Sequence, residues 1–323
     1  MPDATLRLPS RPPPTIGKNG KPKRSRRGLI AGLTVIGLLG VTAVGAWAWW
    51  NGSFGPVAIR DHCTATTPAT ATNPIKVAEL EPEQAGNAAI ITALARKRGL
   101  PARAASIAVA TAIQESKLRN INYGDRDSLG LFQQRPSQGW GTRKEITDPV
   151  YATNAFYDVL AKIDGYETME ITKVAQKVQR SAFPDAYADH EPEARIIASA
   201  LSGYSPGGFN CVLHASSAAA QNVTAGSLTT RAKAMSSAAG KETGHKDAKP
   251  VGSGGTSLRF AVPTSTNDRD AWALAHWAVA RAAGLEVTRV DVANQRWDRD
   301  NSTDGWAAQK TELPNGAVII TVA

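Results

Sequence analysis

The sequence holds only two cysteines and five histidines in 323 residues. The histidines lack the spacing of metal ligands, so no metal site is predicted. The sequence also lacks a Gly-x-Ser-x-Gly elbow and a phosphate-binding Gly-Lys-Ser/Thr loop, since the glycines at 252–255 precede no such pair. These absences argue against metal, serine-nucleophile and nucleotide chemistry, and no cofactor is expected.

Charged side chains are absent from residues 29–50. As a helix, this segment would span about 33 Å, enough to cross a bilayer. Residues 1–28 carry eight basic side chains and one acidic one, and by the positive-inside rule this disordered tail stays in the cytoplasm. The sequence therefore predicts a single-pass protein of the cell membrane, with the bilayer as a partner of residues 29–50 and the remaining chain outside.

A cleaved signal peptide ending at Ala46-Trp47-Ala48 is the alternative for this segment. Its apolar stretch is longer than the usual signal core of about 7–15 residues, which favours the anchor. Basic and acidic residues nearly balance after residue 28, so nucleic-acid binding is not expected despite the net charge of +9. A transporter is disfavoured because Thr34 and Thr42 are the only polar side chains along the segment.

Composition divides the remaining chain into four regions. Residues 51–79, rich in Thr, Ala and Pro, are interpreted as a stalk, and residues 80–213 as an all-α domain. Residues 214–257, rich in Ser, Ala and Gly, predict a flexible linker. Residues 258–323 combine a helical pattern with two β-rich runs, so they predict a small α+β accessory module of unknown role.

Helix boundaries are marked within the all-α domain. Glu81-Pro82-Glu83 begins a helix that Gly99 ends, and Pro101 begins a second one that fades at residues 117–120. Asp148-Pro149 begins a third.

Cys63 and Cys211 bracket this domain. Thiols outside the cytosol tend to oxidise, so the pair predicts a disulfide that closes a loop of about 150 residues and stabilises the fold by several kcal/mol. Two free thiols or an intermolecular bridge are the alternatives.

Glu115 is the main candidate for chemistry. Ala108, Ala112 and Glu115 share one face of the second helix, and small side chains let another element approach and exclude water. Desolvation and the helix C-terminus both raise a carboxyl pKa, and a protonated carboxyl is what general-acid cleavage of a glycosidic bond requires. The alternative is an ordinary solvated glutamate at a helix end.

The segments Gln114-Glu115-Ser116 and Ser128-Leu129-Gly130-Leu131-Phe132-Gln133 resemble the Glu-Ser and Gly-Leu-Met-Gln motifs of soluble lytic transglycosylases and goose-type lysozymes. The resemblance covers about residues 85–205 and implies a lysozyme-like domain. The stretch 122–141 also resembles one found in exported wall proteins of high-GC Gram-positive bacteria.

The resemblance implies a role for each matching residue. Glu115 would protonate the leaving oxygen, and Ser116 would orient the glutamate or the substrate. Gln133, with the backbone of Gly130 and Leu131, would hold an N-acetyl sugar.

The family's later Ala-Tyr-Asn-Ala-Gly motif is absent. Val178-Gln179-Arg180-Ser181 stands in its place, followed by Phe183 and Tyr187. Gln179 and Ser181 are candidates to replace its hydrogen bonds, and Tyr187 is a further candidate for substrate binding.

Asp125 and Asp127 are candidates for a second catalytic carboxylate. In an inverting hydrolase one of them would activate water about 6.5–9.5 Å from the acid, whereas a lytic transglycosylase needs no such base. Their alternative roles are loop caps or ion-pair partners of the nearby arginines Arg119, Arg126 and Arg135.

Aromatic side chains of the same segment are candidates for stacking on sugars or for the core, namely Tyr123, Phe132 and Trp140. Arg135 is a candidate to pair with carboxylates of the wall polymer. The sequence thus predicts an enzyme that cleaves β-1,4 links between N-acetylmuramic acid and N-acetylglucosamine in peptidoglycan, as a lyase or a hydrolase. The alternative is an inactive lysozyme-like protein that binds peptidoglycan as a scaffold.

Overall fold

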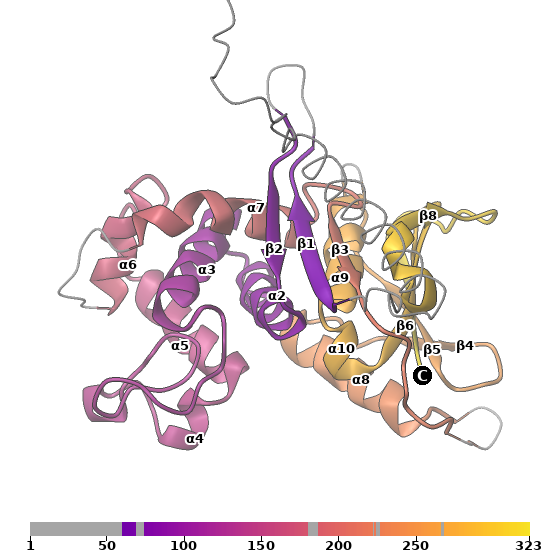
Figure 1. Cartoon of the computed structure of the whole chain (residues 1–323), viewed down its shortest axis with the longest axis horizontal. Coiled ribbons are helices and arrows are strands. Elements are labelled where there is room, and N and C mark those ends of the chain that lie inside the picture. Colours follow the sequence, from indigo (N-terminus) through magenta and orange to yellow (C-terminus); the bar gives the residue numbers. More distant parts are fainter. Residues whose placement is uncertain (1–59, 69–73, 180–186, 222, 224–226, 266–267) are drawn as a thin grey trace, which may run out of the picture. The chain divides into compact units, whose positions relative to one another are not determined.

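The computed structural model describes residues 60–68, 74–179, 187–221, 223, 227–265 and 268–323. Two antiparallel sheets and a set of helices make up this part of the chain, which belongs to one compact unit (Figure 1). Its elements include the helices α2 Pro82–Lys97, α3 Ala102–Ser116, α4 Arg143–Ile146, α5 Pro149–Leu160, α6 Ile171–Gln179 and α7 Glu191–Leu201.

Helix α2 is buried along nearly its whole length. Pro82 starts the helix, and the Gln84 side chain accepts a hydrogen bond of 2.8 Å from the Glu81 amide at the N-cap. Every residue from Ala85 to Ala95 is buried. Its many alanines allow α3, α5, α7 and the later helix α9 (Arg269–Ala280) to pack closely around it.

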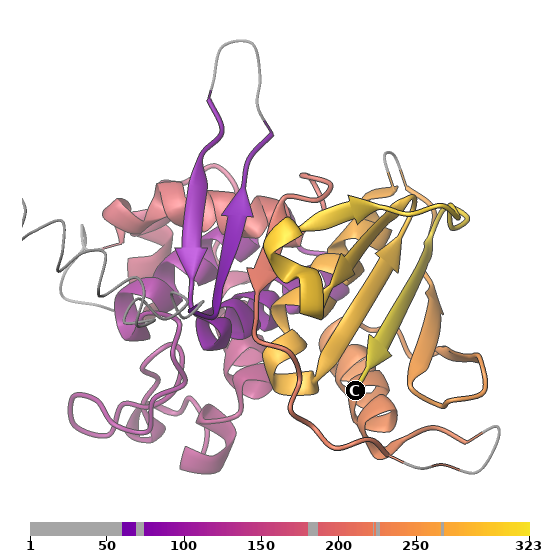
Figure 2. The ribbon, with the colours of Figure 1, turned by 45° about the vertical axis from the view of Figure 1, so that its right-hand side comes forward.

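A six-stranded antiparallel sheet follows in the second half of the chain, in the order β4-β5-β9-β6-β7-β8 (Figure 2). Its strands are β4 Lys249–Val251, β5 Ser257–Ala261, β6 Val287–Val292, β7 Gln295–Asp298, β8 Trp306–Ala308 and β9 Ala317–Val322. Helix α10 (Ala282–Leu285) precedes β6, and short 3-10 helices occur at Pro136–Gln138 (η1), Ala188–His190 (η2) and Arg299–Asp304 (η4).

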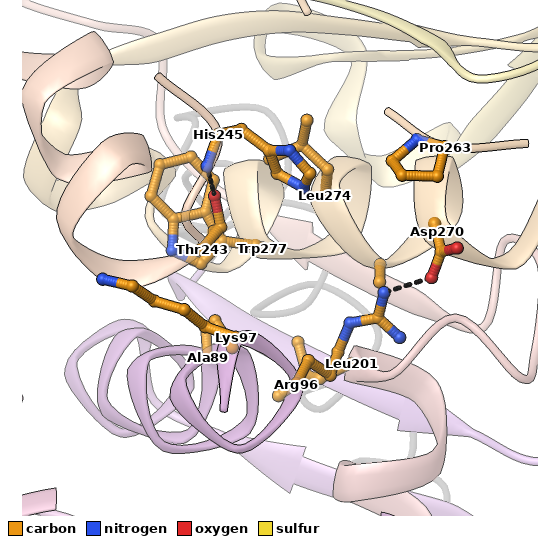
Figure 3. Close-up of a pocket in the computed structure, with 12 residues that line it drawn as sticks. Ala89, Arg96, Lys97, Leu201, Thr243, His245, Pro263, Asp270, Leu274 and Trp277 are labelled. Atoms are coloured by element: carbon orange, nitrogen blue, oxygen red, sulfur yellow. Dashed lines mark hydrogen bonds and ion pairs between the residues drawn. The ribbon is translucent and has the colours of Figure 1, made fainter. Parts of the chain in front are cut away.

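Helix α9 lies between the helices of the first half of the chain and the six-stranded sheet of the second half. It packs against α2 and α7 and also against β6 and β9, so Ala271–Ala280 are all buried. Trp277 donates a 2.8 Å hydrogen bond to Glu242 at the end of α8 (Thr230–Glu242), and His276 pairs with the Ala200 carbonyl oxygen of α7 at 2.8 Å. A cavity lies between α2 and α9 (Figure 3).

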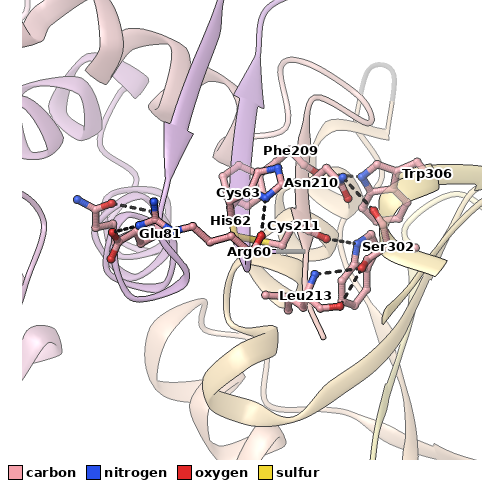
Figure 4. Close-up of a disulfide and its surroundings, with 12 residues drawn as sticks. Arg60, His62, Cys63, Glu81, Phe209, Asn210, Cys211, Leu213, Ser302 and Trp306 are labelled. Atoms are coloured by element: carbon pink, nitrogen blue, oxygen red, sulfur yellow. Dashed lines mark hydrogen bonds and ion pairs between the residues drawn. A yellow bond between two sulfur atoms is a disulfide. The ribbon is translucent and has the colours of Figure 1, made fainter. Parts of the chain in front are cut away.

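A second, three-stranded sheet has the order β2-β1-β3 and is built from β1 His62–Thr66, β2 Val77–Leu80 and β3 Phe209–Val212. Cys63 and Cys211 lie directly opposite each other on β1 and β3 and form a disulfide (Figure 4). Both are buried. The expected disulfide is confirmed, and it joins β1, which precedes α2, to β3, which follows α7.

The expectation of an all-α domain is wrong, because β1, β2 and β3 belong to the same packed unit as the helices. Thr, Ala and Cys at 62–66 alternate between buried and partly exposed positions, as in a strand with one covered face. Residues 230–242, within the expected linker, form α8, because Ala232, Met235 and Ala239 share one buried face.

No helix of the described residues is long and apolar enough to span a bilayer. The expected all-α architecture behind a spanning helix is therefore not what the structure contains. Residues 29–50, for which that helix is expected, lie outside the described residues, as do residues 1–28.

Candidate functional site

Glu115 lies in the last turn of α3, partly buried by neighbouring elements. The Tyr187 hydroxyl donates a 2.7 Å hydrogen bond to its Oε1 atom. Burial raises the pKa of Glu115 above its usual value, and the hydrogen bonds from Tyr187 and Gln179 offset only part of this effect. The carboxyl group is therefore shielded and holds its proton more tightly than a solvated glutamate does.

Gln179, the last residue of α6, connects this carboxyl to the segment around residue 132. Its Nε2 atom donates a 2.6 Å hydrogen bond to the Phe132 carbonyl oxygen, and its side chain also bonds to Glu115. The structure thus brings Glu115, Gln179 and Tyr187 together from three distant segments. Arg180, Ser181 and Phe183 lie outside the described residues.

The chain turns sharply directly after Glu115. Lys117 and Leu118 both have positive φ, of 53° and 58°, which is unfavourable for residues other than glycine. Side chains of α2 hold this turn: Gln84 donates to the Lys117 carbonyl oxygen and buried Asn87 to that of Leu118, each at 2.8 Å. Helix α2 therefore determines where α3 ends and where its terminal carboxyl is placed.

The structure shows no hydrogen bond from the Ser116 side chain to Glu115. Its hydroxyl donates to the carbonyl oxygens of Leu131, at 2.8 Å, and Ala112, at 3.1 Å. Leu131 and Phe132 are fully buried, and the Phe132 ring stacks on Phe156 with 4.7 Å between the ring centroids. Of the two roles considered for Phe132, stacking on sugars or packing in the core, the structure shows the core position.

Gly130 allows the loop to pass close to α4. Its φ is +74°, and a Cβ atom there would lie 2.5 Å from the Ile146 carbonyl oxygen. Gln133 also has positive φ, and its Nε2 atom donates to the carbonyl oxygens of Gly130 and Tyr123, at 3.2 and 3.3 Å. The Gln133 side-chain amide therefore stabilises its own loop. Its N–H groups, which would otherwise be available to a sugar, donate to carbonyl oxygens of that loop.

The two aspartates differ in their surroundings. Asp127 accepts hydrogen bonds from Arg135 Nε at 2.8 Å and from the amide and hydroxyl of Ser137. These bonds, the one from Arg135 foremost, lower the pKa of Asp127 well below its usual value. The Asp125 side chain is 87% exposed and lies 3.9 Å from Arg126. Asp127 and Arg135 therefore act as a loop brace, and neither aspartate contributes to the raised pKa of Glu115.

The remaining aromatic candidates differ in exposure. Trp140 packs against the edge of the hydrophobic core and is partly buried. Tyr123 is 69% exposed, so its ring is available at the surface of the loop.

Sequence reasoning assigned no role to three residues that support the site, namely Asn87, Gln114 and His190. Asn87 holds the turn after α3, and Gln114 accepts from or donates to the His190 ring at 2.8 Å, which links α3 to the segment that carries Tyr187. Of the three, only Gln114 could have been suspected from the sequence, because it lies next to Glu115. Asn87 and His190 contact their partners from distant parts of the chain.

No cluster of three or more metal-ligating side chains occurs among the described residues. No protein-family model matches the chain, and no curated protein matches it.

Proposed function

We propose that the chain is a peptidoglycan-cleaving enzyme that uses Glu115 as its general acid. The observation that carries the proposal is the shielded Glu115 carboxyl at the end of α3, whose pKa is raised by burial. The ordered resemblance of residues 114–116 and 128–133 to lytic transglycosylases supports the substrate class. The location outside the cell membrane, inferred from residues 1–50, is part of the same proposal.

The reaction that fits this site best is lytic transglycosylation. Protonated Glu115 gives its proton to the glycosidic oxygen as the bond from that oxygen to C1 of the muramyl sugar breaks. The 6-hydroxyl of the same sugar then forms a bond to C1 and returns its proton to Glu115. This route needs no second carboxylate, consistent with Asp127 being paired with Arg135 and Asp125 being exposed.

The test is digestion of purified peptidoglycan by the full-length chain, followed by mass spectrometry of the released fragments. We expect anhydro-muramyl ends from the wild type and none from Glu115→Gln. Asp125→Asn, which replaces an exposed carboxylate in the segment that follows α3, is the matched control and keeps activity. Cleavage by Glu115→Gln at the wild-type rate refutes the role of Glu115, and reducing ends refute the lyase route.

A glycan-binding protein without turnover is the second candidate. The fact that favours it is that the family's Ala-Tyr-Asn-Ala-Gly motif is absent from the sequence. In that case wild-type protein sediments with insoluble peptidoglycan yet releases no fragments.

A further inference from the structure

A second site lies apart from Glu115, in a cavity of about 190 Å³ between α2 and α9. Thr243 and His245, which follow α8, border it together with Pro263 (Figure 3). None of the groups that contact Glu115 takes part in its lining.

The floor of this α2–α9 cavity is apolar. Ala89 and Ala93 of α2 face Leu274 and Trp277 of α9 across it. An engineered protein cavity of about 150 Å³ is large enough to bind benzene, so this one has room for a six-membered ring or a short branched chain with a small head group.

Polar groups border the cavity on more than one side, with Lys97 at one edge and the Arg96–Asp270 pair at the other (Figure 3). Arg96 forms an ion pair with Asp270, so their charges largely cancel. Lys97 donates a 2.6 Å hydrogen bond to the Lys241 carbonyl oxygen and retains two further donor hydrogens. Its positive charge is not paired with a carboxylate among the described residues.

His245 supplies a second free donor. Its ring makes no hydrogen bond within the described part of the chain, and Figure 3 shows it turned toward the space between α2 and α9. Burial, together with the nearby Arg96, lowers the pKa of His245, so the neutral ring offers one N–H group at neutral pH.

A neighbouring groove shares Lys97 with the cavity and is lined by further lysines. This groove has a volume of about 580 Å³, and its further lysines are Lys233, Lys241 and Lys246. Like charges grouped along a concave surface raise the local concentration of ligands of opposite charge. The charge balance therefore favours a ligand with a single negative charge.

We propose that the α2–α9 cavity binds a small monocarboxylate with a compact apolar body. The carboxylate accepts a hydrogen bond from the His245 ring and is attracted by the positive charge of Lys97 at the edge of the cavity, and the apolar body packs against Leu274 and Trp277. This site would act independently of the Glu115 site, because the two share no residue.

Benzoate is a suitable probe, and benzamide is its uncharged counterpart of nearly the same shape. Binding to the full-length chain in a non-ionic detergent is measured by calorimetry. We expect benzoate to bind about tenfold more tightly than benzamide, the difference that one charge-assisted contact provides. Equal affinities, or no saturable binding of benzoate, overturn the proposal.

Two variants locate the binding. Lys97→Met keeps the aliphatic stem but removes the ammonium, and we expect it to weaken benzoate binding about tenfold. Lys162→Met, on an exposed part of the α5–α6 connection, is the matched control and leaves binding unchanged. Ala93→Leu fills the cavity and abolishes binding. Equal binding to the Lys97→Met and Lys162→Met variants contradicts the assigned site even if Ala93→Leu does not fold.

Discussion

Glu115 shows how neighbours far apart in the chain set the proton affinity of one side chain. Its raised pKa means that the folded protein binds this proton more tightly than the unfolded chain does. The contribution of Glu115 to stability is therefore greatest below the usual pKa of 4.5 and declines as pH rises through the raised value.

Glu115→Gln removes this decline. We expect the variant to gain stability relative to the wild type as pH rises from 4.5 toward neutrality, because the wild type must then bury an ionised carboxylate. Urea unfolding at a series of pH values gives both curves. Parallel curves for the two proteins would show that Glu115 is not shielded.

His276 affects the pH dependence of stability in the opposite direction, because burial lowers its pKa. It is completely buried between Trp272 and Trp306, and burial lowers its pKa from 6.5 to about 4. Below pH 6.5 the unfolded chain binds a proton that the folded protein excludes, so stability falls as pH drops toward 4. We expect a loss of about 3 kcal/mol from this group across the window.

The same unfolding series, repeated with His276→Asn, tests this prediction. Asparagine keeps a donor for the Ala200 carbonyl oxygen but does not titrate, so the acid-side slope between pH 6.5 and 4 becomes shallower. An unchanged slope would assign the acid sensitivity to other groups.

At the level of single residues, sequence reasoning succeeded where the local pattern carried the information. Glu115 at a helix end behind small residues was predicted with its raised pKa. The hydrogen bonds of Gln179 and Tyr187 to Glu115 were not predicted, because these two residues were considered only for substrate binding. Phe132 and Gln133 were candidates for sugar binding, but the Phe132 ring lies in the core and the Gln133 amide bonds within its own loop. Their partners lie in α5 and within the loop itself, and no spacing rule specifies such contacts.

At the level of elements, the turn that ends α3 depends on α2. Asn87→Ala leaves the buried Leu118 carbonyl oxygen without its donor, and we expect a cost of about 1–3 kcal/mol in unfolding free energy. Gln84→Ala removes the neighbouring bond to Lys117 together with the N-cap bond from the Glu81 amide, both at more exposed positions, and is the comparison variant, with a cost of about 1 kcal/mol. Chemical denaturation measures both; equal losses would mean that burial of Asn87 does not matter.

Helices with clear start signals were predictable. Asp148 caps α5 by accepting a 2.8 Å hydrogen bond from the Val150 amide, with Pro149 in the first turn, as its sequence indicated. The short strands β1 and β2 were missed because their Thr- and Ala-rich sequence has the composition of a stalk. The two strands pair with each other, and the second partner of β1, strand β3, lies about 150 residues away in the chain, so only tertiary contacts reveal the whole sheet.

At the scale of the whole described unit, the C-terminal region is bound tightly both to strand β3 and to helix α2. Trp297 and Trp306 donate hydrogen bonds to the carbonyl oxygens of Cys211 and Phe209 on β3, at 3.1 and 2.8 Å. The Arg96–Asp270 ion pair joins α2 to α9. Sequence composition suggested a separate accessory module, because a helix buried on all sides, such as α9, does not reveal which elements cover it.

The disulfide is the longest-range covalent restraint on this unit. It joins residues 148 apart, so its loss frees a large loop in the unfolded chain. We expect the paired replacement Cys63→Ala and Cys211→Ala to lower the unfolding free energy by about 3–5 kcal/mol. Because both sulfurs are buried, a reductant should act only after the protein unfolds. Wild type unfolded and refolded in reductant should then match the double variant in denaturant midpoint. If both keep the midpoint of the oxidised wild type, the β1–β3 pairing holds without the covalent link and the stabilising role of the disulfide is refuted.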